Sequence, residues 1–152
     1  MILLNAEVVR FLLEQSFTIV ATISGDGSIH SACKGIIKIS GNKIYLLDLY
    51  RGKTLTNLHK DSNISIIAVD EHEFKGFCVK GKARIMTIAE FGPELIKAWE
   101  DKITSRVTQR LLKNIKDKKG HRLHPEALLP KPEYVIVLDV KSVVDLTPHQ
   151  LK

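Results

Sequence analysis

Hydrophobic and polar positions in the first third of the chain form three blocks separated by short polar turns. The block at 17–23 is rich in β-branched residues, and a Ser-Gly-Asp-Gly run at 24–27 ends it. Since Asp-Gly favours a tight hairpin turn, a second strand is predicted from about 28 to 39. A polar turn at 40–43 leads into a third strand at 43–49. Such short turns between consecutive strands predict an antiparallel meander.

The pattern then predicts one short helix and further strands. Residues 53–60 suit a helix, and the nearly continuous apolar runs at 64–70 and 134–140 predict strands that are buried on both faces. Alternation at 77–85 predicts a strand with one solvated face, in which Gly81 marks a bulge or a close approach of another group. Val143-Val144 either extends the strand at 134–140 or starts a short seventh one.

Two longer helices are predicted outside the strands. Apolar residues at three- and four-residue steps within 1–15 predict an amphipathic helix, and a similar stripe follows Gly92-Pro93. Trp99 lies on the second stripe, where a core or dimer contact is expected. The polar, proline-containing stretch at 117–132 predicts a surface loop.

These elements predict a mainly β fold with α-helices (α+β), in which six or seven antiparallel strands close into a small barrel. Closure removes the exposed strand edges, and the helices cap the barrel or pack on its outside. The length of 152 residues fits a single domain spanning 1–152.

Charge and cysteine content indicate which partners and which cellular compartment to expect. The net charge is +6, but nine Lys/Arg against three Asp/Glu between 97 and 122 account for all of it. A solvated helix face explains that surplus better than a nucleic-acid site, so no nucleic-acid partner is expected. Two cysteines without metal spacing indicate reduced thiols in a cytoplasmic protein, and no segment predicts a membrane span or a secretory signal.

The most specific chemistry lies where the third strand passes into the short helix. Gly52 allows a sharp turn, and Arg51, Lys53 and Thr54 surround the first turn of the helix. Unpaired N–H groups and two cations there suit a phosphate group. The alternative is structural: Thr54 is the N-cap of the helix and Asn57 its weak capping-box partner. The residues alone leave both interpretations open.

The ordered set of features resembles a known family. An Asp-Gly hairpin, a long strand, a Lys-Thr-x-x-Asn-Leu helix and a buried strand, together covering 17–86, resemble the FMN-binding split-barrel family, which includes pyridoxamine 5'-phosphate oxidase. The resemblance implies a homodimer with FMN at two sites along the subunit interface. It implies phosphate contacts from Arg51, Gly52, Lys53 and Thr54, with Asn57 nearby. It implies that the flavin ring lies against Ser31, Ala32, Cys33, Lys34, Asp48, Leu49 and Tyr50.

The chain departs from the vitamin-B6 oxidase in two places. Ala32 stands where that enzyme has a phosphate-binding arginine, with Lys34 as a possible substitute, and its C-terminal basic substrate residues have no counterpart. The resemblance therefore implies an FMN-dependent oxidoreductase or electron carrier, whose electron donor and acceptor it does not name. No catalytic side chain is assigned, because the flavin itself carries the redox chemistry. The alternative is a non-catalytic binding module for haem, a deazaflavin or stored FMN.

Histidine and acidic residues give no strong metal signal. His121, His124 and Glu126 have a spacing that could hold a metal on a helix, but Gly120 and Pro125 favour a loop there. No metal site is therefore expected, and neither His30 nor His59 is singled out as a haem ligand.

Overall fold

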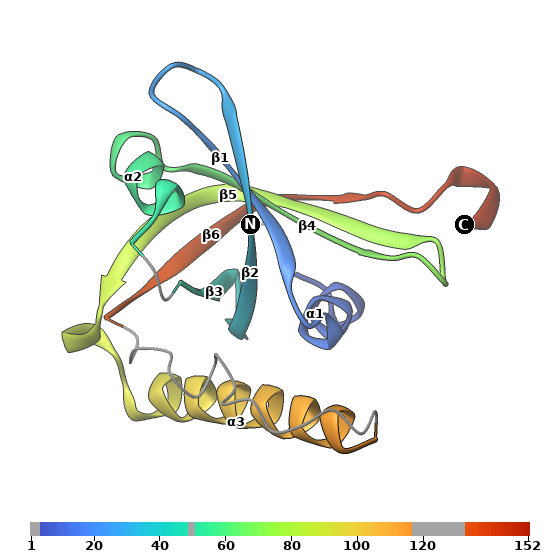
Figure 1. Ribbon diagram of the computed structural model, residues 1–152. Coiled ribbons are helices and arrows are strands. Elements are labelled where there is room, and N and C mark those ends of the chain that lie inside the picture. The colour runs from blue at the N-terminus through green and yellow to red at the C-terminus, as the bar shows by residue number, and fades with distance from the viewer. Residues whose placement is uncertain (1–3, 49–50, 117–132) are drawn as a thin grey trace.

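The computed structural model describes residues 4–48, 51–116 and 133–152. Strands of the described residues form a closed barrel in the order β1-β2-β3-β6-β5-β4, and every neighbouring pair is antiparallel (Figure 1). The strands are β1 Thr18–Ile23, β2 Ile29–Ser40, β3 Lys43–Leu47, β4 Asn63–Asp70, β5 Lys75–Thr87 and β6 Tyr134–Asp145. The α-helices are α1 Ala6–Glu14, α2 Lys53–Lys60 and α3 Pro93–Lys116, and short 3₁₀ turns lie at Ile88–Glu90 and His149–Leu151. This arrangement confirms the predicted α+β antiparallel barrel.

The hairpin between β1 and β2 is the tight turn expected from its Asp-Gly pair. Gly27 has a φ of 82°, a left-handed conformation that glycine adopts without steric cost. Asp26 accepts hydrogen bonds from the backbone N–H and the hydroxyl of Ser28. These two bonds hold the pKa of Asp26 below its usual value.

The barrel interior is filled by the inward-facing residues of every strand. Side chains with no more than 1% exposure come from all six strands: Val20, Ile36, Ile44, Leu46, Ile66, Val79, Ile136 and Leu138. Helix α1 joins this core, where the ring of Phe11 meets that of Phe77 edge-on with 5.2 Å between centroids. The amphipathic N-terminal helix of the sequence is therefore confirmed over 6–14.

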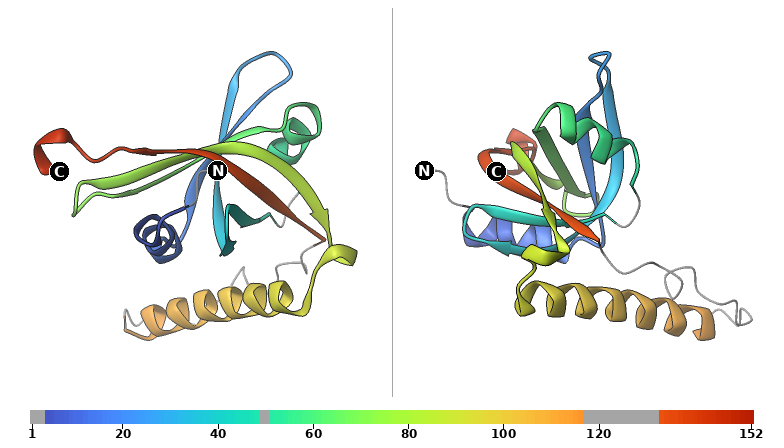
Figure 2. Two further views of the ribbon diagram at one scale, coloured as in Figure 1. Left: turned by 180° about the vertical axis from the view of Figure 1, so that it is seen from behind. Right: turned by 90° about the vertical axis from the view of Figure 1, so that its left-hand side faces the viewer.

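Helix α3 forms a separate layer against one outer side of the barrel (Figure 2). Leu95 of α3 packs with Ile37, Leu47 and Val135, and Trp99 lies against this cluster, as its position on the apolar stripe predicts. Residues 135–138 of β6 are fully buried, because the barrel core covers one face of this strand and α3 covers the other. No described helix is both long and apolar enough to cross a membrane.

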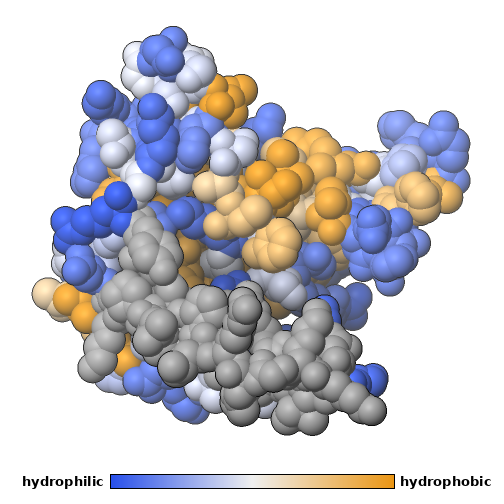
Figure 3. Space-filling view, in the orientation of Figure 1, coloured by the Kyte–Doolittle hydropathy of each residue, from blue (hydrophilic) through white to orange (hydrophobic). Residues whose placement is uncertain are grey.

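The single chain covers only one face of the strand at 64–70, and burial of the other face by a second copy stays a prediction. Ile64, Ile66 and Ala68 are buried, but Ile67 is half-buried and Val69 is 58% exposed. The strand alternates because its outer face carries no helix among the described elements. Figure 3 shows hydrophobic residues gathered on the surface around β1 and β4.

Strand β6 is longer than its apolar run suggests. Val143 and Val144 pair with β5, so they extend β6 and do not form a seventh strand. The register between the two strands shifts at Lys80/Gly81, which confirms the predicted bulge. A Cβ at Gly81 would collide with the carbonyl oxygen of Asp139, so this close approach requires glycine.

The β4–β5 hairpin and the C-terminal half of β6 extend beyond the barrel (Figures 1 and 2). We call this three-stranded extension, residues 67–78 and 142–146, the arm. The expected surface loop at 117–132 lies outside the described residues.

Candidate cofactor site

Helix α2 begins without a side-chain cap. Gly52 occupies the N-cap position, so the alternative in which Thr54 is the N-cap is wrong. Helix α1 provides a direct contrast, because Asn5 Oδ1 accepts a hydrogen bond of 2.8 Å from the N–H of Val8. Since glycine has no side-chain acceptor, no described side chain caps the first N–H groups of α2.

Two cations lie at this helix end. Lys53 is exposed, makes no ion pair with another described residue, and is close enough to Asp26 to influence its carboxyl group. Arg51 is also exposed, but its guanidinium contacts Glu133 at 2.6 Å. The first turn of α2 contains no acidic residue. Lys53, Arg51 and the partial positive charge of the helix N-terminus therefore lie together, and their expected contact with a phosphate group stays a prediction.

Thr54 and Asn57 lie on the opposite, buried side of α2. Thr54 is 2% exposed, and its hydroxyl makes no hydrogen bond to another described residue. Asn57 is 1% exposed and donates from Nδ2 to Thr22 Oγ1 at 3.0 Å and to Ser24 Oγ at 3.3 Å. Asn57 thus fixes α2 against β1, and a direct contact with a cofactor stays a prediction.

Lys34 and Asp48 form a buried ion pair at the end of β3. Their Nζ and Oδ1 atoms are 2.5 Å apart, and the side chains are 14% and 2% exposed. Tyr134 donates a hydrogen bond of 2.9 Å to the second carboxylate oxygen of Asp48. Burial first, and then this bond to a carboxylate, raise the pKa of Tyr134 well above its ordinary value.

This ion pair bears on the two roles expected for Lys34, which are contact with the flavin ring and replacement of the phosphate-binding arginine. Its ammonium group is held inside the barrel by Asp48, and its expected role as a substitute for the missing arginine stays a prediction. No pattern in the sequence marks Tyr134 or Glu133 as a site residue. The available signal for Tyr134 was a single hydroxyl at the start of an otherwise aliphatic strand.

The remaining predicted site residues of β2 divide between its two faces. Ala32 pairs with the buried Val20 and shares its inward side, as Lys34 does. Ser31 and Cys33 are exposed on the outward side, opposite Ala21 and Ile19 of β1. Leu49 and Tyr50 lie outside the described residues.

Arg106 is not the solvated cation that the basic helix predicts. It donates a hydrogen bond to the carbonyl oxygen of Ser16, and its guanidinium lies over Gly35, where a Cβ would be 2.6 Å away. Burial lowers the pKa of Lys102 on the same helix. Arg106 therefore links α3 to the segment that leads into β1 and to β2.

The described residues contain no group of three or more His, Cys, Asp or Glu side chains placed to hold a metal ion. His121, His124 and Glu126 lie outside them, so their expected place in a loop is not tested.

The closed antiparallel barrel of six strands, with α-helices packed on it, has the α+β split-barrel fold. A family model described as pyridoxamine 5'-phosphate oxidase matches residues 4–131 of the sequence. The chain belongs to this pyridoxamine 5'-phosphate oxidase-like family of split-barrel proteins. No curated protein matches the sequence.

Solved structures support the same fold. HupZ from Group A Streptococcus is 17% identical with a TM-score of 0.67, and the match covers 95% of each chain. A putative pyridoxamine 5'-phosphate oxidase from Lactobacillus delbrueckii is 15% identical with a TM-score of 0.63, over 93% of each chain. An F420 reductase is 15% identical with a TM-score of 0.50, over 88% of this chain and 93% of its own. At such identities the likeness concerns the fold alone.

Proposed function

We propose that this protein binds FMN at a homodimer interface and acts as an oxidoreductase or electron carrier. The observation that carries the proposal is the uncapped N-terminus of α2, flanked by Lys53 and Arg51. Membership of a family whose model is named for a flavoenzyme supports the choice of FMN over other anions.

The phosphate group of FMN suits this helix end. Lys53 supplies a full positive charge, the N–H groups of the first turn supply directed donors, and Arg51 adds a second charge when it leaves Glu133. Thr54 supports the site through its backbone N–H, because its side chain is buried. Asn57 contributes by holding α2 on β1.

In this proposal the flavin ring lies against the outward-facing side of β2. Ser31 and Cys33 face outward there, whereas Lys34 and Asp48 lie beneath, inside the barrel. When bound, FMN supplies hydride or single-electron transfer at its ring. The chain holds the phosphate, orients the ring and limits the access of water. No catalytic side chain is assigned.

The second copy is proposed because the outer face of the barrel carries an apolar row that no described helix covers, and part of that row is exposed. In register across the sheet, an apolar row runs through Cys33, Ile19, Ile67, Cys78 and Val144, one residue from each of five strands. Ile19 and Val144 are each 42% exposed. Exposed apolar surfaces of this kind mark protein–protein contacts.

The proposal does not extend to oxidation of pyridoxamine 5'-phosphate. Ala32 stands at the position that the resemblance gives to the arginine of that enzyme, and the ion pair of Lys34 with Asp48 argues against Lys34 as its substitute. The electron donor and acceptor are left unassigned.

The absorption spectrum of the purified protein tests the proposal directly. We expect a flavin spectrum, or saturable FMN binding by the apoprotein, with much weaker binding of riboflavin. A haem band or selective binding of the deazaflavin F420 would favour the corresponding alternative cofactor. Failure to bind FMN at micromolar concentration would contradict the proposal.

A further inference from the structure

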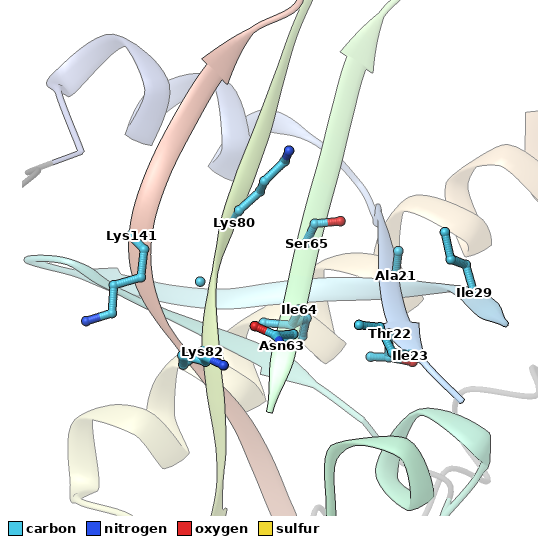
Figure 4. A pocket seen from close by; sticks show the side chains of 11 residues that line it. Ala21, Thr22, Ile23, Ile29, Asn63, Ile64, Ser65, Lys80, Lys82 and Lys141 are labelled. Atoms are coloured by element: carbon cyan, nitrogen blue, oxygen red, sulfur yellow. The ribbon is translucent and has the colours of Figure 1, made fainter. Parts of the chain in front are cut away.

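One end of the uncovered outer face contains a groove with a positive rim. It has a volume of about 390 Å³ and runs from the start of β2 across β1, β4, β5 and β6. Its apolar side is formed by Ala21, Ile23 and Ile29, of which Ile29 is 76% exposed. Lys80, Lys82 and Lys141 occupy the other side, as Figure 4 shows, together with Asn63 and Ser65.

The three lysines are free to meet a partner. None of them forms an ion pair with another described residue, and no acidic side chain lines the groove. The nearest acid in the strand register is Asp139, opposite Lys82, and its carboxylate lies 3.9 Å from Lys43. The groove therefore suits an apolar group that is accompanied by negative charge.

The opposite end of the same face is acidic and carries an exposed aromatic ring, so its charge is complementary to that of the groove. The tip of the arm carries Asp70, Glu71 and Glu73, followed by Phe74, which is 66% exposed. Phe74 has a φ of 49°, a conformation that is uncommon for a bulky residue. Together with Val69 and Leu146 it lines a second hollow, of about 560 Å³, on the tip.

The positions of groove and tip are nearly symmetric about the apolar row defined above. Asp70 lies three residues beyond Ile67 on β4 and Asn63 lies four residues before it. At about 3.3 Å per residue these separations are roughly 10 Å and 13 Å. A two-fold axis that follows the apolar row, across the strands, would pack that row on itself and place each tip over the groove of the other copy.

We propose that two copies of this chain pair in this way, with the acidic, Phe74-bearing tip of each seated in the lysine-rimmed groove of the other. The inference rests on the homodimer proposed above and fixes which residues meet. A two-fold axis along the strands would instead bring the two tips together. Three carboxylates would then face three carboxylates, and the groove lysines would also face each other, which like-charge repulsion disfavours.

Charge reversal tests the pairing in the full-length protein. Glu71→Lys with Glu73→Lys should raise the dimer dissociation constant at least tenfold in sedimentation. Adding Lys80→Glu and Lys82→Glu to the same chain should restore most of the affinity. The matched control is Glu100→Lys with Asp101→Lys on the exposed side of α3, which should leave the dimer unchanged.

Cross-linking provides a second readout that tolerates a small loss of stability. In a Cys33→Ser, Cys78→Ser background, Glu73→Cys combined with Lys82→Cys should give a covalent dimer on mild oxidation. Neither cysteine alone should do so. Efficient cross-linking by Glu73→Cys alone would overturn the proposal, because it would place tip against tip.

The outcomes also separate this inference from the proposed function. A dimer whose affinity ignores the tip charges contradicts the pairing and leaves the homodimer and FMN binding intact. A monomer at micromolar concentration contradicts both the pairing and the interfacial site. Loss of FMN binding alone leaves the pairing unaffected, because neither measurement involves the cofactor.

Discussion

Lys34 and Asp48 form an ion pair with 2.5 Å between Nζ and Oδ1, although fourteen residues separate them and only 2% of the Asp48 side chain is exposed. The pair links the middle of β2 to the end of β3, directly before the segment that carries Arg51 and Lys53. Tyr134 adds β6 to this junction through its hydrogen bond to Asp48. Asp48 is therefore held by two contacts just before the segment at 51–54 that is proposed to bind the phosphate.

Asp48→Ala should lower the free energy of unfolding by about 3 kcal/mol. The change leaves the ammonium group of Lys34 buried without its partner and removes an acceptor of Tyr134. Denaturant unfolding measures the loss. Asp139→Ala, which breaks an exposed pair with Lys43 at 3.9 Å, is the matched control and should cost less than about 1 kcal/mol. Equal losses in both variants would contradict a structural role for the buried pair.

Tyr134 should make stability fall at alkaline pH. Its pKa is raised in the folded state above the value of 10.0 for a free tyrosine, so the folded protein holds this proton more tightly than the unfolded chain. The resulting stability is complete below pH 10 and is lost as the pH rises toward the folded-state pKa. Tyr134→Phe should unfold more readily at neutral pH yet show a shallower decline above pH 10. Parallel declines for both proteins would refute the raised pKa.

Lys53→Ala should weaken FMN binding by about ten- to a hundredfold, because a charged hydrogen bond contributes roughly 1.5–3 kcal/mol. Binding of riboflavin, which has no phosphate, should hardly change. Fluorescence titration of both ligands measures the difference. Lys60→Ala in the last turn of the same helix is the control and should affect neither ligand. A similar loss for FMN and riboflavin would mean that Lys53 acts on the ring or the fold.

Glu133→Gln should strengthen FMN binding by up to about fivefold. The carboxylate of Glu133 holds the guanidinium of Arg51 at 2.6 Å, and an exposed ion pair of this kind contributes about 0.2–1 kcal/mol. Its neutralisation frees Arg51 for the phosphate. Glu94→Gln, which breaks the exposed pair with Lys38, serves as control. Weaker FMN binding in Glu133→Gln would show that the pair orients Arg51 rather than occupying it.

Local patterns in the sequence were sufficient for most of the barrel. The Asp-Gly turn at 26–27, the alternation at 77–85 and the helix at 53–60 depend on neighbours within a few residues, and all three are confirmed. The position of Gly81 in the strand also predicted the bulge correctly. Only glycine fits there, because the carbonyl oxygen of Asp139 lies where the Cβ of any other residue would be. The family could likewise be inferred, since its features follow one another along the chain.

Sequence patterns by themselves do not show which face of a strand is covered. The apolar run at 64–70 suggests burial on both faces, yet α3 covers the outer side of β6 and leaves that of β4 open. The difference depends on where α3 packs, although this helix begins only at Pro93, well after β4 ends at Asp70. The uncovered face, and with it the proposed partner surface, was therefore visible only in the folded chain.

The candidate site shows the same division. The sequence by itself determined that a helix starts next to Gly52 with Arg51 and Lys53 beside it, because the start of a helix depends on residues close together in the chain. Only the tertiary structure decided that Lys34 turns inward to Asp48, that Asn57 anchors α2 on β1, and that Glu133 meets Arg51 across 82 residues. Contacts between distant segments depend on strand order and closure of the barrel, which no spacing along the chain encodes.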